Sequence, residues 1–324
     1  MTIRMEWPEM INKKATREGF GDAMLSLGHQ NPRVLALCAD LSGSLKLNAF
    51  VEAFPDRFIQ CGIAEANMVG VAAGLATGGF IPFTATFANF STSRVFDQVR
   101  QSIAYSGKNV KLCASHAGLT LGEDGATHQV MEDLAMMNAL PHMTVINPCD
   151  YNQTFRATHA IAAMDGPVYL RFGRPGVPNF FPDDASFEIG KAWHVTAGRD
   201  VSVFATGHMV WKALEAAKTL AQEGLSVELI NIHTIKPLDE AAVLRSARKT
   251  GRVVVAEEHQ QQGGLGAKVA TLLSHHHPTP MRLVGLDDRF GESGKPDQLL
   301  AKYHLDTPDI IHAIRVLKQA ATSA

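Results

Sequence analysis

Residues 64–87 read AEANMVGVAAGLATGGFIPFTATF, a helix-like segment followed directly by a strand-like one. Residues 64–79 are rich in alanine and glycine and end in two glycines, which is typical of a closely packed helix stopped by a glycine cap. Residues 81–87 then form a short apolar run of the length of a buried strand. A helix that passes straight into a buried strand predicts one unit of an α/β domain.

The same alternation extends in both directions from this segment. Continuous apolar runs are typical of parallel strands covered on both faces, and apolar residues at helical spacing lie between them. Strands are predicted at 34–40, 110–116, 144–148 and 167–172, and helices at 14–30, 91–106, 128–140 and 151–164.

Residues 173–184 (GRPGVPNFFPDD) are dense in proline and glycine, which predicts a domain linker. A second series of strands (200–207, 225–233, 252–259, 281–287) and helices (209–223, 238–251, 263–273 and a C-terminal helix) follows it. We therefore expect two α/β domains, residues 1–180 with a mostly parallel sheet and residues 185–324.

Composition excludes several classes of protein. The 30 lysines and arginines nearly balance the 32 aspartates and glutamates, so no strong field attracts nucleic acid or an anionic membrane. No apolar run reaches the ~18 residues of a membrane span, and residues 1–14 have no apolar signal-peptide core. Neither a dinucleotide or P-loop motif nor a His/Cys cluster with metal-ligand spacing is present. We expect a cytoplasmic enzyme that itself binds no metal.

Glu65 begins the alanine-rich helix, and its neighbours are small and apolar. Two interpretations stay open. A carboxylate at a helix N-terminus can simply favour the helix dipole. It can also be a buried acid with a raised pKa that shares a proton with a ligand.

Two aromatic residues follow the strand that ends near residue 87. Phe87 and Phe90 lie in a polar segment, and loops at the carboxyl ends of parallel strands are where α/β sheets bind ligands. They can be core residues, or they can stack on a flat heterocycle.

The next loop, SHAGLTLGEDGATHQ (115–129), carries His116, Asp124 and His128. These are more polar groups than a turn requires, and histidine can donate to a substrate hydroxyl or take its proton. Arg171 and Arg174 follow a later strand, where one of them could bind a phosphate or form a surface ion pair.

Four motifs together resemble the transketolase family. GIAEANMVGVAAGLATGG (62–79) is similar to the segment that carries its cofactor-activating glutamate, and GEDGATHQ (122–129) is similar to its GEDGPTHQ signature, with Ala126 in place of proline. ADLSGS (39–44) resembles a strand end of the family. VVVAEEHQQQGGLG (253–266) resembles a C-terminal domain that transketolases share with deoxyxylulose-phosphate synthases and beta subunits of 2-oxoacid dehydrogenases.

The resemblance extends from about residue 13 to the C-terminal domain. It implies a pyrimidine-binding domain with a parallel sheet, followed by a transketolase C-terminal α/β domain. It also implies thiamine diphosphate as cofactor, with Glu65, His116 and His128 as catalytic residues and Phe90, beside Phe87, stacking on the pyrimidine. The implied substrate contacts are Asp40, Ser44, His116, Asp124, His128 and Arg174.

Two departures from the family pattern concern the substrate. Lys13 and Lys14 stand where the family has a phosphate-binding arginine near the start of this half, and Ser93 replaces a further aromatic.

A larger departure is the absence of a GDG sequence, because the family's diphosphate-binding domain holds its divalent cation with a GDG…N motif. The resemblance therefore implies one subunit of a split transketolase. A separate N-terminal subunit would hold Mg²⁺ or Ca²⁺ and share the cofactor, in an A2B2 assembly that acts on sugars or sugar phosphates. The alternatives are a 2-oxoacid dehydrogenase beta subunit, a deoxyxylulose-phosphate synthase-like enzyme and a non-catalytic scaffold subunit. GEDGATHQ favours sugar chemistry, and the intact site residues argue against a scaffold.

Overall fold

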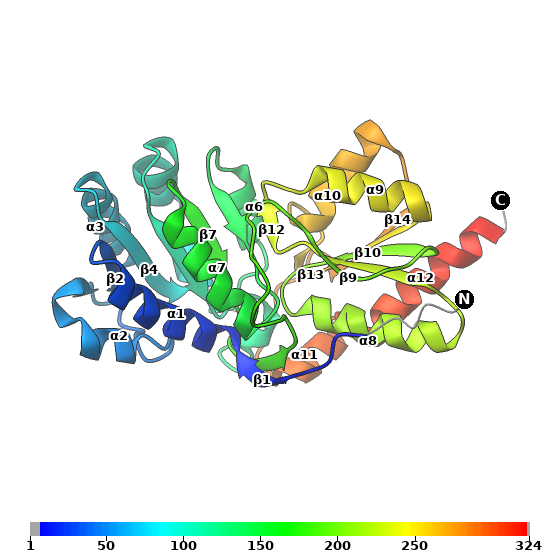
Figure 1. Cartoon of the computed structure of the whole chain (residues 1–324), viewed down its shortest axis with the longest axis horizontal. Coiled ribbons are helices and arrows are strands. Elements are labelled where there is room, and N and C mark those ends of the chain that lie inside the picture. The colour runs from blue at the N-terminus through cyan, green and yellow to red at the C-terminus, as the bar shows by residue number, and fades with distance from the viewer. Residues whose placement is uncertain (1–6, 323–324) are drawn as a thin grey trace.

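The computed structural model describes residues 7–322. The outer limits of the two predicted domains, at residues 1 and 324, and the first six residues of the predicted non-signal N-terminus lie outside the described residues. Figure 1 shows two α/β units side by side, each built on its own sheet.

The first unit is built on a seven-stranded sheet. Six strands are parallel in the order β6-β7-β5-β4-β2-β3, and β12 joins the β6 edge in the antiparallel direction. The strands are β2 (Val34–Cys38), β3 (Phe58–Gln60), β4 (Ile81–Phe87), β5 (Lys111–Ser115), β6 (Thr144–Ile146), β7 (Val168–Arg171) and β12 (Thr234–Lys236). Every residue of β2, β4, β5 and β7 is buried, as expected for strands covered on both faces.

Helices cover both faces of this sheet. The helices α1 (Thr16–Gln30), α2 (Asn48–Ala53) and α7 (Tyr151–Ala163) share a hydrophobic core with one face. The helices α3 (Glu65–Thr77) and α6 (Asp133–Ala139), with a π-helix at Val99–Tyr105, pack on the other. Shorter helices are α4 (Ala88–Thr92) and α5 (Phe96–Gln98), and 3₁₀ turns lie at Pro55–Arg57 and Leu119–Leu121.

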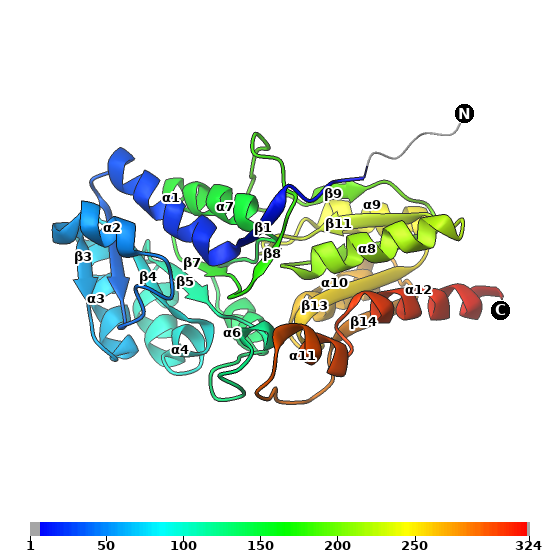
Figure 2. The same cartoon turned by 90° about the horizontal axis from the view of Figure 1, so that it is seen from below.

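The second unit is built on a five-stranded sheet with the order β14-β13-β10-β11-β9, in which only β9 is antiparallel. Its strands are β9 (Trp193–Thr196), β10 (Val201–Ala205), β11 (Val227–Asn231), β13 (Val253–Gln260) and β14 (Met281–Leu286). The helices α8 (Met209–Gln222) and α12 (Thr307–Thr322) lie on one face, and α9 (Glu240–Thr250) and α10 (Leu265–His276) on the other. The helix α11 (Pro296–Lys302) lies against the first unit (Figure 2). The expected fold class, two α/β domains of which the first has a mostly parallel sheet, is confirmed.

Two predicted segments differ from the structure. The predicted linker at 173–184 contains a strand, β8 (Gly176–Asn179), which pairs with β1 (Asn12–Ala15) in a small antiparallel sheet. The predicted helix at 14–30 therefore begins only at Thr16.

The helix predicted at 128–140 is also shorter than expected. It begins at Asp133, and the N–H groups of His128 and Gln129 donate to the carbonyl of Gly125 in a preceding turn. The predicted helix at 91–106 is divided into short pieces that end in the π-helix. Both interruptions lie next to the candidate site.

Candidate functional site

The candidate site lies at the carboxyl ends of β2, β4 and β5, the edge where parallel sheets of α/β proteins bind ligands. Asp40 and His116 follow β2 and β5, and both have a left-handed backbone with φ of 59°. A non-glycine residue in that conformation is strained, and such strain gathers at functional sites.

Glu65 is buried at the start of α3, only 3% exposed, and it is paired with Arg94. Arg94 Nη1 lies 3.1 Å from both Glu65 carboxylate oxygens. The Arg94 guanidinium also lies over the ring of Phe90, 4.2 Å from its centroid. Glu65 is therefore a buried carboxylate, and the polar segment after β4 brings an arginine to it.

The Arg94 guanidinium indicates what kind of group can bind between Glu65 and Phe90. It is planar, bears nitrogen, lies on the Phe90 ring and donates to the Glu65 carboxylate at the same time. An aminopyrimidine is also planar and bears nitrogen, so the residues present fit the pyrimidine of thiamine diphosphate.

Four rings form a continuous cluster beside Glu65. The rings of Phe87 and Phe90 are stacked, with centroids 5.8 Å apart, and Phe87 also stacks on His116 at 3.9 Å. His128 meets the edge of Phe90 at 5.3 Å. The structure thus brings together predicted residues from two separate segments, one after β4 and one after β5.

His116 is buried and held by its neighbour. Its Nδ1 lies 2.8 Å from the hydroxyl of Ser115, which fixes the ring. Burial, together with the positive charges of Arg17 and Arg174, lowers the pKa of His116 to about 3. His116 is therefore a neutral hydrogen-bonding group at pH 7.

A basic pocket opens next to His116. It has a volume of about 450 Å³, and we call it the anion pocket; its basic residues are Lys13, Lys14, Arg17 and Arg174. Burial and then the charge of Arg174 lower the pKa of Arg17, so Arg17 and Arg174 repel each other. Arg174 is partly neutralised by Glu123 at 2.6 Å. An incoming anion would relieve the remaining repulsion.

Arg17 is the residue that the sequence analysis missed. Arg17 lines the anion pocket, and its Nη1 donates to the carbonyl of Ser44 at 2.9 Å. The structure thus supplies an arginine close to Lys13 and Lys14. The available signal was an arginine in the first turn of the first predicted helix, three residues after Lys14.

Asp40 and Asp124 are more exposed than Glu65 and His116. Both side chains are exposed, and the N–H of Asp40 donates to the Gln60 side chain. The structure places Asp124 in the same loop as His116 and His128, which we call the histidine loop (residues 116–132).

One face of α3 carries two glycines with open space beside them. A Cβ added to Gly70 or Gly74 would meet no atom within 4 Å, and both residues are exposed. Ile63, just before the helix, is 79% exposed. Helix glycines cost stability unless something approaches closely, so this face is suited to close packing against another chain.

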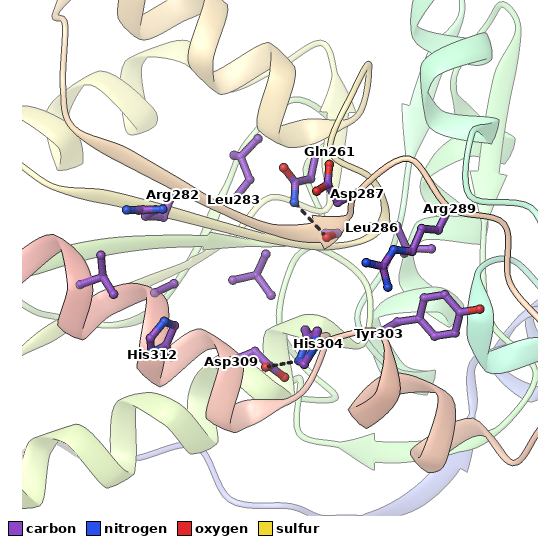
Figure 3. Close-up of a pocket in the computed structure, with 14 residues that line it drawn as sticks. Gln261, Arg282, Leu283, Leu286, Asp287, Arg289, Tyr303, His304, Asp309 and His312 are labelled. Atoms are coloured by element: carbon purple, nitrogen blue, oxygen red, sulfur yellow. Dashed lines mark hydrogen bonds and ion pairs between the residues drawn. The ribbon is translucent and has the colours of Figure 1, made fainter.

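A separate cavity of about 360 Å³ lies between β14 and α12 (Figure 3). Its basic lining residues include Arg282, Arg289 and His312, and His304 is paired with Asp309 at 3.2 Å. None of the predicted site residues lines this cavity.

Across residues 7–322, no helix is both long and apolar enough to span a bilayer. Within the same part of the chain, no cluster of three or more His, Cys, Asp or Glu side chains could hold a metal ion.

Comparison with known proteins gives consistent results along the chain. Residues 12–179 match the pyrimidine-binding domain of transketolase, and residues 190–310 match the transketolase C-terminal domain. The chain is 45% identical over 297 residues to a 6-deoxy-6-sulfo-D-fructose transketolase subunit of Clostridium sp. (strain MSTE9), covering 92% of each chain. It is 36% identical to one subunit of the apulose-4-phosphate transketolase of Phocaeicola vulgatus, covering 92% of this chain and 96% of that one.

A solved structure, described as a split gene transketolase in an inactive beta4 tetramer, is 48% identical to the chain. It superposes with a TM-score of 0.88 and covers 94% of this chain and 98% of that one. The two family matches are consecutive and cover most of the chain, and similar relatives of about the same length are subunits. The chain therefore belongs to the transketolase family, with the pyrimidine-binding and C-terminal domains of that family on one polypeptide, as in split transketolase subunits.

Proposed function

We propose that this chain is the C-terminal subunit of a two-subunit, thiamine diphosphate-dependent transketolase that moves a two-carbon ketol unit from a ketose to an aldose. The observation that carries the proposal is that Glu65 and Phe90 both contact the Arg94 guanidinium. A buried carboxylate and an aromatic face lie close enough for one planar group to bind both.

Each residue of the site has a defined task in this proposal. Glu65 holds and releases a proton at the pyrimidine ring nitrogen, and Phe87 and Phe90 fix the plane of that ring. When bound, thiamine diphosphate supplies the electron sink for the carbon–carbon bond cleavage. His116 and His128 would bind sugar hydroxyls. Because Nδ1 of His116 is hydrogen-bonded to the hydroxyl of Ser115, Nε2 is the nitrogen left to bind a hydroxyl of the sugar.

The far end of the sugar is recognised by the anion pocket. Arg17 and Arg174, with Ser44 beside them, would bind a terminal anionic group, and Asp40 and Asp124 would contact hydroxyls. Similar relatives are named for a sulfonated sugar and for a sugar phosphate. We therefore propose a ketose with a terminal phosphate or sulfonate as substrate.

The diphosphate and its Mg²⁺ or Ca²⁺ would be held by a separate N-terminal subunit carrying the GDG…N motif. The open glycine face of α3 supports a chain boundary next to Glu65, and two-fold symmetry favours an A2B2 assembly with two sites. Domain limits near residues 180 and 185 and a cytoplasmic location belong to the same proposal.

Coexpression tests this function. The chain and a neighbouring GDG-bearing chain are purified together and assayed for ketol transfer from phosphorylated, sulfonated and neutral ketoses, with the mass of the complex measured in parallel. We expect transfer by the complex and none by the chain alone. Equal transfer by the lone chain, or no transfer from any ketose by an intact complex, would contradict the proposal.

A further inference from the structure

Two consecutive glutamates of β13, Glu257 and Glu258, are buried, and their side chains make contacts on opposite sides of the strand. Side chains alternate between the two faces of a strand. Glu257 accepts the N–H groups of Leu265 and Gly266, at 2.8 Å and 2.7 Å, and thereby caps α10. This capping explains the glycine-rich turn of the C-terminal motif. Among residues 7–322, the only side chain of its own domain that pairs with the Glu258 carboxylate is that of His208.

Glu258 reaches across to the first domain. Its Oε1 accepts the N–H of Thr120 at 2.6 Å, and its Oε2 accepts the Thr120 hydroxyl at 3.3 Å. His208, at the start of α8, lies 3.2 Å from the same Oε2 through Nδ1. The carboxylate is 4% exposed, so these contacts form away from water.

The histidine loop passes directly over this carboxylate. Gly118 has a φ of +80°, and a Cβ at this position would lie 2.3 Å from the Glu258 carboxyl carbon. Only a glycine allows the loop to approach so closely. The Glu258 carbonyl also accepts Arg171 Nη2 at 2.8 Å, so both the backbone and the side chain of Glu258 bind the first domain.

A second attachment holds the other end of the same loop. Gln129 Nε2 donates to the carbonyl of Leu119 within the loop, at 3.1 Å, and to the carbonyl of Glu292 in the C-terminal domain, at 3.0 Å. Gly125, with a φ of +74°, lies against Ser293, whose hydroxyl would be 2.4 Å from an added Cβ. The loop that carries His116 and His128 is therefore held from the C-terminal domain at two points.

Thr120 links this attachment to the substrate side. It lines the anion pocket with Arg17 and Arg174, and it also lines a small internal cavity with His208 and Glu258. A shift of Thr120 would therefore alter the wall of the anion pocket and the path of the chain after His116.

We propose that Glu258 is a positioning residue for ketol transfer, which fixes the histidine loop through Thr120 so that the C-terminal domain sets the geometry of the substrate site. This inference rests on the function proposed above. Glu258 touches neither the place for the pyrimidine nor Glu65, so its loss should affect the binding of the sugar more than the chemical step.

Kinetics of the complex with its partner subunit provide the first test. Glu258→Ala should raise the KM of the anionic ketose, by about tenfold if the released Thr120 weakens ketose binding by roughly 1.4 kcal/mol, while kcat changes less. Glu258→Gln should recover most of the affinity, because an amide oxygen can still accept the Thr120 N–H. Glu257→Ala is the matched control: it removes a buried carboxylate one residue away and should leave the KM close to that of the wild type.

Hydrogen exchange of the purified chain provides a test that does not depend on activity. Glu258→Ala should speed exchange in peptides covering 117–129, and Glu257→Ala should speed exchange in peptides covering 263–270 instead. Gly118→Ala should also speed exchange there, but its φ of +80° strains any other residue at this position, so it does not isolate Glu258. Glu258→Met keeps most of the side-chain volume and removes the acceptor, and it should give the same pattern if Glu258→Ala does not fold.

The two proposals fail in different ways. A wild-type complex without ketol transfer overturns the proposed function, whereas the exchange data still decide the role of Glu258. An active complex in which Glu258→Ala and Glu258→Met leave both the ketose KM and the exchange of 117–129 unchanged overturns the positioning role alone.

Discussion

One guanidinium nitrogen of Arg94 lies 3.1 Å from each carboxylate oxygen of Glu65. The same guanidinium covers the ring of Phe90, so Arg94 occupies both contacts that the pyrimidine would need. The Arg94 side chain is 49% exposed, whereas Glu65 is only 3% exposed, so a buried carboxylate would be left unpaired if Arg94 simply moved away. Arg94 can therefore be displaced only by a group, such as the cofactor ring, that takes over its contacts with Glu65 and Phe90.

Substitutions of Glu65 and Arg94 should have opposite effects. Glu65→Gln keeps the shape of the side chain but cannot share a proton, so turnover of the complex should fall by about a hundredfold or more. Arg94→Gln removes the competitor, so the Kd for thiamine diphosphate should fall while turnover persists. Titration of the cofactor and steady-state assays measure both effects. Near-normal turnover of Glu65→Gln, with an unchanged melting temperature, would remove Glu65 from the mechanism.

The two histidines should affect the sugar and not the cofactor. His116→Asn suits the left-handed backbone at this position, which asparagine tolerates, and His128→Ala removes the second ring. Each should raise the KM of the ketose or lower the rate of transfer, while the Kd of thiamine diphosphate stays within about twofold of the wild-type value. A variant that mainly weakened cofactor binding would show that the histidine loop binds the cofactor and not the sugar, contrary to this proposal.

Burial of His116 also predicts a dependence of stability on pH. Its pKa is lowered from 6.5 to about 3 in the folded chain, so the unfolded chain binds the extra proton between these values. The contribution of His116 to stability is present above pH 6.5 and is lost as the pH falls toward 3. His233, with a pKa lowered by burial to about 4, acts in the same direction. Melting temperatures of His116→Asn should therefore decline less steeply than those of the wild type between about pH 7 and pH 5, and an identical slope would contradict the assignment.

Arg17 should recognise the anionic end of the substrate. Arg17→Gln removes one of the two guanidiniums of the anion pocket, and the KM of a phosphorylated or sulfonated ketose should rise about tenfold or more. A neutral ketose should be affected little. Arg33→Gln makes the same change at an exposed arginine just after α1 and serves as the control. Equal effects of Arg17→Gln on the KM of charged and neutral ketoses would show that the anion pocket does not recognise the charge of the substrate.

The glycine face of α3 should be required for assembly and not for folding. Gly70→Leu adds a side chain where the isolated chain has open space, so the chain should fold and yet fail to form the complex with its partner, as measured by mass. Gly28→Leu is the contrasting variant, since a Cβ at Gly28 would lie 2.2 Å from Phe54 and should damage the fold itself. A four-chain complex formed equally well by Gly70→Leu would place the interface elsewhere.

The sequence predicted the long buried strands and the alanine-rich helix well, because their apolar patterns are continuous and local. β4 was predicted with its observed limits, Ile81–Phe87. β12, with only three residues, was missed because it is stabilised by pairing with β6, a strand 88 residues earlier when counted from Ile146 to Thr234. Short elements of this kind have no pattern of their own.

The candidate site shows the same limit. Glu65 and Phe90 could be selected because their motifs are local, but the pairing of Glu65 with Arg94 joins residues 29 positions apart. Arg17 could not be assigned to the anion pocket because the Ser44 carbonyl and Arg174 reach it from distant segments. Tertiary contacts, and not local pattern, define these roles.

The antiparallel pairing of β12 with β6 has a consequence for dissecting the protein. β12 belongs to the C-terminal half of the sequence, but it covers the outer edge of the first domain's sheet. A fragment cut at the segment after residue 180 would expose the unpaired N–H and C=O groups of β6, and an open sheet edge is a template for aggregation. The two halves are thus separate in sequence but protect one another in solution, so a genetic or proteolytic division between them would yield insoluble pieces instead of two working modules.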